Sequence, residues 1–302
     1  MPSRSGLFGR LAAAMITPFD AEGALDTEGA QRLAVRLVDE EGCDGLVLSG
    51  TTGEAPTTSD AEKSALVRAV VEAVGDRAAV VAGVGTHDTR HTVALARAAE
   101  RAGAHGLLVV TPYYSRPGQE AVTQHLLSVA DSTGLPVLLY DIPGRTGTAL
   151  SAETLLRLAE HPRVQGVKDC SYDLMKAARV MAASDLAYYA GCDEQILPLR
   201  AIGAVGCVST AANVVGRQVA AMLDAYEAGD HREATRRHLS LVPLIDALMT
   251  QEPGSVTVKA LLHAQGLPGG PVRGPLLPAE PPLTARLLEC FAQATAPEPA
   301  LR

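Results

Sequence analysis

The chain has 302 residues, of which 47% are hydrophobic and 20% are charged, and its formal net charge is -8 at pH 7. This acidic balance excludes nucleic acid and an anionic membrane as main partners, because neither attracts a negative surface, and no apolar run approaches the roughly 18 residues of a membrane-spanning helix. The five cysteines are odd in number and lack a close metal-binding spacing, which argues against a full disulfide framework and indicates a reducing cytoplasm.

The first apolar run, from Leu11 to Ile16, follows Arg4 and Arg10 and superficially resembles a secretory leader. The run is too short for a leader and continues directly into Thr17-Pro18-Phe19-Asp20. We therefore expect it to be part of the folded protein.

Short apolar runs alternate with amphipathic helical stretches along most of the chain. Near-continuous apolar strands of this kind are typical of a parallel sheet that helices cover on both faces. A capping-box pattern, Ser59-Asp60-Ala61-Glu62, marks one of the helix starts. The expected strands are 11–17, 45–49, 78–83, 106–110, 136–140, 164–168, 186–190 and 206–209.

Eight such units, at intervals of roughly 20 to 35 residues, predict an α/β fold, a closed (β/α)8 TIM barrel. A doubly wound sheet usually has fewer strands and a glycine-rich phosphate loop, but Gly83-Val84-Gly85 lacks the third glycine. From about Asn213 onward the pattern is helical, with a loop over residues 266–282 before a last helix. We expect one structural unit, with the barrel in residues 1–225 and a C-terminal helical extension in residues 226–302 packed on it.

Polar side chains gather where the predicted strands end, which is where the catalytic groups of such barrels lie. Because the strands are parallel, their carboxyl ends should meet on one face. The residues concerned are Thr51 and Thr52 after the second strand, Tyr113 and Tyr114 after the fourth, Tyr140 and Arg145 at the fifth, Lys168 at the sixth and Gly191 after the seventh.

Lys168 is one of only four lysines, against 22 arginines. A guanidinium stays protonated and cannot act as an amine nucleophile, so a lysine at the end of a buried strand suggests an amine that attacks a carbonyl. An apolar interior disfavours the ammonium form, and the imine formed with a ketone is an electron sink whose enamine can attack an aldehyde. The alternative is a strand-end lysine that reaches solvent or pairs with an acid.

Hydroxyl groups and one arginine could assist this chemistry. Tyr140, Thr51 and Tyr114 can both donate and accept protons, and so can form a relay without a fixed charge. The planar fork of Arg145 suits a carboxylate, and backbone amides around Thr51 and Thr52 could hold another. As alternatives, Tyr114 could pack in a loop, Arg145 could be a surface residue and the threonines could simply form a turn.

Four segments together resemble the dihydrodipicolinate synthase and N-acetylneuraminate lyase family, and the similarity covers nearly the whole chain. They are Gly50–Glu54, Thr111–Pro117, Tyr140–Gly147 and Gly166–Asp169. The resemblance implies a lyase, a class I pyruvate aldolase on a (β/α)8 barrel that forms a Schiff base without metal or other cofactor. It also implies a homotetramer built from two tight dimers.

The resemblance assigns the chemistry to the strand ends. Lys168 would form the imine, and Tyr140 would be the central proton relay and general acid and base. Thr51 would link Tyr140 to Tyr114, which in the family reaches into the site of the neighbouring subunit.

The same resemblance assigns the substrate contacts. Thr52 would bind the carboxylate of pyruvate, Arg145 would bind that of the second substrate, and Gly191 and Val208 would line the site with their backbones. Pro143-Gly144-Arg145-Thr146 looks like the synthase branch, which condenses pyruvate with aspartate β-semialdehyde in lysine and diaminopimelate synthesis.

Three departures from the family pattern leave the second substrate open. Cys192 stands where an aspartate is common, Asp169 replaces a glutamate, and Gly254-Ser255 replaces Asn-Pro. Another class I pyruvate aldolase, or a sugar-acid lyase or dehydratase, therefore stays an alternative. A non-catalytic barrel that binds pyruvate or an amino acid is a further one, which the presence of Lys168 and Tyr140 disfavours.

Two histidines are candidate metal ligands. His87 and His91 have the i, i+4 spacing of a zinc site, but without a third clustered ligand a solvated helix face is favoured and no metal is expected. Lys63 and a protonated His91 would repel the ammonium groups of free lysine, so we expect the enzyme to be insensitive to lysine.

Overall fold

A closed barrel of eight parallel strands forms the centre of the computed structural model, which describes residues 8–296. The strands pair in chain order and β1 closes on β8, so the TIM-barrel prediction is confirmed and the doubly wound alternative is wrong. The strands are β1 (Leu11–Ala14), β2 (Gly45–Leu48), β3 (Ala79–Gly83), β4 (Gly106–Val110), β5 (Val137–Asp141), β6 (Val164–Asp169), β7 (Ala187–Ala190) and β8 (Gly206–Ser209). The apolar run that resembled a leader is thus largely β1, while Arg4 lies outside the described residues.

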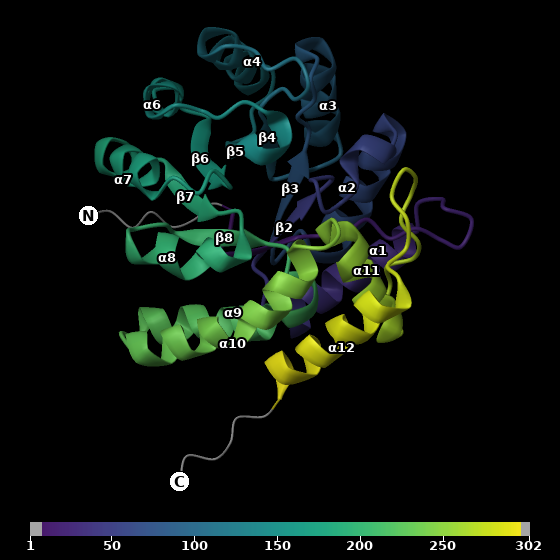
Figure 1. Ribbon diagram of the computed structural model, residues 1–302. Coiled ribbons are helices and arrows are strands. Elements are labelled where there is room, and N and C mark those ends of the chain that lie inside the picture. The colour runs from purple at the N-terminus through teal and green to yellow at the C-terminus, as the bar shows by residue number, and fades with distance from the viewer. Residues whose placement is uncertain (1–7, 297–302) are drawn as a thin grey trace.

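Helices ring the strands (Figure 1). Those between the strands are α1 (Thr27–Val35), the π-helical η1 (Arg36–Glu40), the short turn η2 (Ala55–Thr57), α2 (Asp60–Val74), α3 (Thr89–Arg101), α4 (Gln119–Asp131), α5 (Pro143–Thr146), α6 (Ala152–Ala159), α7 (Leu174–Ala183), the turn η3 (Asp193–Gln195) and α8 (Ile196–Ala201). The expected capping box is present at α2, where Ser59 and Glu62 each bond the backbone of the other. The Ser59 hydroxyl and the Glu62 carboxylate accept hydrogen bonds from backbone amides that the start of a helix would otherwise leave without a partner.

Two apolar layers hold the barrel together. One fills its interior and includes Ala12, Val47, Leu138 and Val208. The other lies between the strands and the surrounding helices. Both faces of the sheet are therefore covered, which explains why the strands read as continuous apolar runs.

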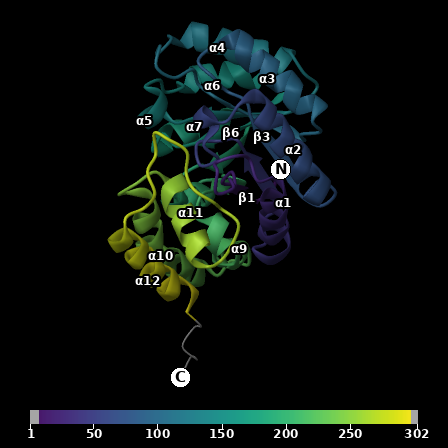
Figure 2. The ribbon, with the colours of Figure 1, turned by 90° about the vertical axis from the view of Figure 1, so that its right-hand side faces the viewer.

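The C-terminal helices lie together on one side of the barrel (Figure 2). They are α9 (Ala212–Glu227), α10 (His231–Met249), α11 (Gly254–Ala264) and α12 (Pro281–Thr295). Helix α9 contacts β1, α10 contacts α9, and α12 contacts α10 and α11. The proposed division at residue 225 falls inside α9 and stays a prediction. Among residues 8–296, none of the helices has the combination of length and hydrophobicity that crossing a membrane requires.

Candidate active site

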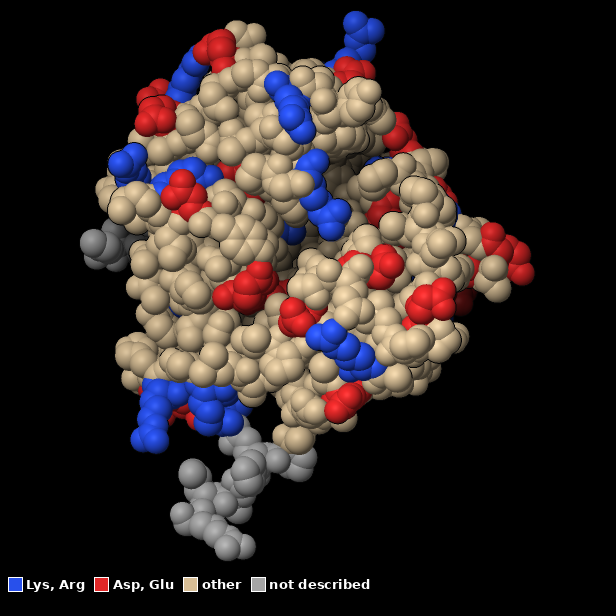
Figure 3. All heavy atoms as spheres, in the orientation of Figure 1, with Lys and Arg blue, Asp and Glu red and all other residues tan. Residues whose placement is uncertain are grey.

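The loops at the carboxyl ends of the strands carry unusual backbone strain. Within the described residues, every non-glycine residue with a positive φ lies in a loop that follows β2, β4 or β6: Ser49, Glu54, Tyr114, Arg116 and Tyr172. Strained residues of this kind cluster at functional sites, at a cost of about 1–3 kcal/mol each. Figure 3 shows a hollow near the middle of this view of the molecule, with basic side chains beside it.

Lys168 is a buried amine inside the barrel. Lys168 is 4% exposed and pairs in register with Tyr140 on β5. Its Nζ lies 4.2 Å from the centroid of the Tyr140 ring. Burial lowers the pKa of Lys168, the positive charge of Arg145 lowers it further, and Cys170, Cys192 and Asp193 partly oppose this shift. The site therefore favours the neutral, nucleophilic amine.

Tyr140 lies between Lys168 and the loop after β2. Burial raises the pKa of its phenol well above the usual value, so the group stays protonated and can donate. Hydrogen bonding to Thr51 lowers the pKa of this phenol and hydrogen bonding to Cys170 raises it, which places both side chains beside Tyr140. The structure thus brings together Lys168, Tyr140 and Thr51, three of the four predicted catalytic groups.

Tyr114 is the fourth group, and in a single chain it lies apart from the other three. Tyr114 is 96% exposed, and its backbone has a φ of 70°. Its neighbour Tyr113 is half-buried and packs edge-on against His87, with ring centroids 5.4 Å apart. A large apolar ring held in solvent by a strained backbone is a surface that another molecule could cover.

Thr52 is buried, and its hydroxyl lies 3.2 Å from that of Thr210, which follows β8. The loop carrying Thr210 is fixed by Asp193, which accepts hydrogen bonds from the Ser209 hydroxyl and from the backbone amides of Thr210 (3.2 Å) and Ala211 (3.0 Å). Sequence reasoning missed Asp193 and Thr210. The polar residues directly after the predicted seventh and eighth strands were the available signal.

Gly191 lies near Lys168, and Val208 lies in the barrel interior; that their backbones line a substrate site stays a prediction. A Cβ built on Gly191 would be 2.5 Å from Cys170 Sγ and 2.9 Å from Lys168 Cγ, so a side chain does not fit there. Val208 is fully buried in the same apolar cluster as Tyr140.

Arg145 lies on the short helix α5, directly after β5, and is exposed. Its charge nevertheless acts on the amine of Lys168. An exposed guanidinium within electrostatic reach of a buried amine can hold an anionic substrate at the mouth of the site.

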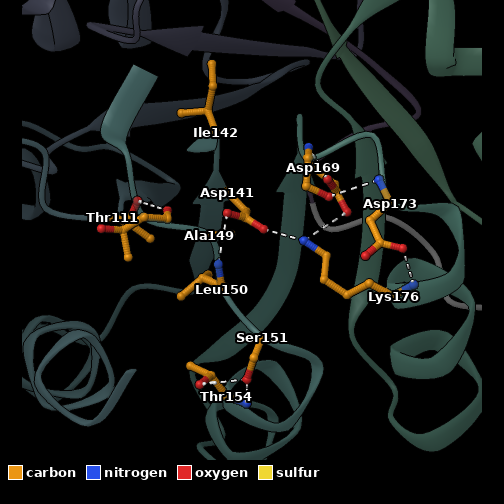
Figure 4. A network of polar contacts seen from close by, with 12 residues as sticks. Thr111, Asp141, Ile142, Ala149, Leu150, Ser151, Thr154, Asp169, Asp173 and Lys176 are labelled. Carbon is orange, nitrogen blue, oxygen red and sulfur yellow. Dashed lines mark hydrogen bonds and ion pairs between the residues drawn. The ribbon is translucent and has the colours of Figure 1, made fainter. Parts of the chain in front are cut away.

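A buried ionic network supports the two central residues from behind (Figure 4). Asp141 follows Tyr140 and Asp169 follows Lys168, so both carboxylates point to the opposite side of their strands. Lys176 of α7 lies 2.5 Å from Asp141 and 4.0 Å from Asp169, measured from Nζ to the nearer carboxylate oxygen. Sequence reasoning missed this network, although Lys176 was visible as one of the four lysines.

The histidines and Lys63 have other contacts. His91 Nε2 lies 2.9 Å from Asp60 Oδ2, and Lys63 Nζ donates to the Ala55 carbonyl at 2.9 Å and to the Thr58 hydroxyl at 2.8 Å. Within residues 8–296, no group of three or more His, Cys, Asp or Glu side chains is placed to hold a metal ion. Insensitivity to lysine stays a prediction.

Comparison with known proteins gives concordant results. The model of the dihydrodipicolinate synthetase family matches residues 7–290. The chain is 62% identical over 293 residues to 4-hydroxy-tetrahydrodipicolinate synthase 1 of Streptomyces coelicolor, covering 97% of this chain and 96% of that protein. It is 57% identical to 4-hydroxy-tetrahydrodipicolinate synthase of Acidothermus cellulolyticus, covering 96% and 94%.

Solved structures agree with these relatives. Dihydrodipicolinate synthase DapA-2 from Bacillus anthracis superposes with a TM-score of 0.92 at 37% identity, covering 96% of this chain and 99% of that chain. DHDPS from Cyanidioschyzon merolae with lysine bound superposes with a TM-score of 0.93 at 34% identity, covering 95% and 98%.

Proposed function

The chain belongs to the dihydrodipicolinate synthetase family, and on this premise we propose that it condenses pyruvate with aspartate β-semialdehyde through an imine on Lys168. It is an enzyme, a lyase of the 4-hydroxy-tetrahydrodipicolinate synthase type. The observation that carries the proposed mechanism is the buried amine of Lys168, 4.2 Å from the Tyr140 ring at the carboxyl end of the barrel.

The first half of the reaction takes place on Lys168. Its neutral amine attacks the ketone carbon of pyruvate, and Tyr140 supplies the proton that lets the oxygen leave as water. Thr51, hydrogen-bonded to Tyr140, passes protons onward. The hydroxyl and backbone of Thr52 hold the pyruvate carboxylate, and Gly191, where a Cβ would lie 2.9 Å from Lys168 Cγ, lets the lysine side chain pass to the ketoacid.

The second half adds the aldehyde. Loss of a methyl proton from the imine gives an enamine, whose carbon attacks the aldehyde carbon, while Tyr140 returns a proton to the new hydroxyl group. Arg145 holds the carboxylate of the aldehyde substrate at the mouth of the site. An amine on this substrate then replaces Lys168 at the former ketone carbon, which closes the ring and frees the lysine.

We further propose that the enzyme works as a homotetramer, a dimer of dimers, in which Tyr114 completes the relay of a neighbouring subunit. The exposure of Tyr114, 96% in one chain, supports this role. The five free cysteines support a reducing compartment, the cytoplasm.

Coupled turnover tests the proposed function. Wild-type protein and Lys168→Ala would be given pyruvate and aspartate β-semialdehyde, with an added reductase whose NADPH oxidation reports the product. We expect turnover by the wild type alone. If the folded wild type shows no more NADPH oxidation than the variant, the proposed aldehyde substrate is wrong.

A further inference from the structure

Two cysteines lie beside Lys168 at the ends of neighbouring strands. Cys170 directly follows β6, and Cys192 lies two residues after β7. The register pairs Asp169 with Ala190, so the next residues of the two strands approach each other. A Cβ built on Gly191, the residue before Cys192, would lie 2.5 Å from Cys170 Sγ, so the two cysteines are neighbours. Both thiols are free.

The two thiols differ in exposure and surroundings. Cys170 is 7% exposed, whereas Cys192 is half-buried and also hydrogen-bonded to the phenol of Tyr172. The hydrogen bonds from Cys170 and Tyr172 hold the pKa of Cys192 below its usual value. The hydrogen bond to Cys192, together with burial, raises the pKa of Cys170. Cys192 is therefore the readier nucleophile, and Cys170 is the thiol positioned to follow it.

We propose that Cys170 and Cys192 are a redox-sensitive pair, which a hydroperoxide converts into a disulfide that stops catalysis at Lys168. The formation of the disulfide is independent of the proposed function, and only the loss of catalysis rests on it.

The oxidation takes place in two steps, through a sulfenic acid on Cys192. The Cys192 thiolate attacks one peroxide oxygen, the O–O bond breaks, and the leaving oxygen takes up the proton that the thiol released, which gives a sulfenic acid and water or an alcohol. Cys170 Sγ then attacks that sulfur, the S–S bond forms, and the hydroxyl group leaves with the Cys170 proton as water. The two thiols lose two electrons in all, and the peroxide gains them.

The new bond would disturb both groups that carry the reaction. Hydrogen bonding to the Cys170 sulfur raises the pKa of Tyr140, so the phenol donates to this sulfur, and a disulfide there changes the acceptor beside the relay. Gly191, which precedes Cys192, lies close to Lys168 Cγ, so drawing the two loops together shifts the wall of the imine site. Because a displacement of about 1 Å at an active site can cost about a hundredfold in rate, we expect kcat to fall by about that factor.

The other cysteines provide the comparison. Cys43 and Cys207 are 2% and 0% exposed, so a peroxide reaches them poorly. Cys290 is half-buried on α12, outside the site. Cys290→Ser is therefore a matched control that should keep the basal activity and the response to peroxide.

To test this, the enzyme would be treated with hydrogen peroxide and the oxidant removed with catalase. Three quantities would then be measured. They are the number of free thiols, the disulfide found by peptide mass mapping, and the turnover before and after dithiothreitol. Wild type, Cys192→Ser and Cys290→Ser would be compared, with each inhibition expressed relative to the untreated activity of the same protein.

We expect the wild type and Cys290→Ser to lose two thiols to a Cys170–Cys192 disulfide, to lose turnover in step with it, and to recover with dithiothreitol. Cys192→Ser should form no such disulfide. The proposal is overturned if peroxide leaves the pair reduced, or if the disulfide forms and turnover persists. If the untreated wild type shows no turnover, the proposed function fails, whereas the mass map still decides whether the pair is oxidised.

Discussion

At the scale of single residues, burial and close packing set the chemistry of Lys168. The amine is surrounded by the Tyr140 ring, by Gly191 and by the thiols of Cys170 and Cys192. Burial lowers the pKa of this amine more than Cys170, Cys192 and Asp193 raise it, so the neutral form is favoured. The reactivity of Lys168 therefore depends on how closely these side chains pack around its amine.

Arg145→Ala should weaken binding of the aldehyde substrate and leave pyruvate little affected. A hydrogen bond to a charged group contributes about 1.5–3 kcal/mol, so the KM for the semialdehyde should rise by about ten- to a hundredfold. Steady-state kinetics with each substrate varied in turn would show this, with the exposed Arg90→Ala as a charge-matched control. An unchanged KM for the semialdehyde would remove Arg145 from the site.

Gly191→Ala should lower kcat without unfolding the protein. The added Cβ would lie 2.9 Å from Lys168 Cγ and 2.5 Å from Cys170 Sγ, so the lysine must shift. We expect a loss of about a hundredfold, by the same sensitivity to misplacement. Gly118→Ala is the control, because a Cβ there meets nothing within 4 Å. Equal activity of the two variants would show that the space beside Lys168 is not needed.

At the scale of elements, Lys176 of α7 joins the ends of β5 and β6. Removing it in Lys176→Met leaves Asp141 buried and without its partner, which should lower the free energy of unfolding by about 3–5 kcal/mol. Urea unfolding followed by circular dichroism measures this loss. The double variant Asp141→Asn with Lys176→Met should recover part of it, because the unpaired charge of Asp141 is removed and only Asp169 is left without the lysine. If the double variant is no more stable than Lys176→Met, the unpaired charge is not the cause.

The elements themselves could largely be predicted from the sequence. All eight expected strands are present, because apolar runs buried on both faces are a local signal. The first strand ends at Ala14 and not at Thr17, and β6 continues one residue past Lys168. Helix α11 begins at Gly254 and Ser255, two residues that carry only a weak helical signal.

The site was only partly predictable. Lys168 and Tyr140 could be found because strand ends meet on one face. The support from Asp193 and Lys176 depends on pairs distant in sequence, which no local pattern encodes. The contact between Cys170 and Cys192 likewise follows from the β6–β7 register.

At the scale of the whole molecule, the segment before the last helix is tied back to the barrel. Arg273 donates to Glu62 of α2, and its guanidinium also bonds the carbonyls of Gly23 and Thr57. Through these contacts the C-terminal segment holds the loop that follows β2 and carries Thr51 and Thr52. The extension therefore supports the site although it contributes no group to the relay.

Stability should depend on Glu62 in acid. Arg273, followed by the Ser59 cap, lowers the pKa of Glu62 from 4.5 to about 2. The unfolded chain therefore binds this proton first as the pH falls, so the stabilisation is complete above about pH 4.5 and is lost towards pH 2. Glu62→Gln should be less stable than wild type at neutral pH, and the difference should shrink through this window.

Urea unfolding at a series of pH values measures this difference. Glu28→Gln is the control, because its side chain is 86% exposed. A difference between wild type and Glu62→Gln that stays constant with pH would show that the pair with Arg273 does not stabilise the fold.

The proposed mechanism depends on an imine between Lys168 and pyruvate, which reductive trapping detects. Wild type and Lys168→Ala would be treated with borohydride in the presence and absence of pyruvate, and the modified lysine would be located by peptide mass mapping. We expect one reduced pyruvate adduct per chain, at Lys168, only with pyruvate and only in the wild type. An adduct at Lys63, Lys176 or Lys259, or no adduct on the folded wild type, would contradict it.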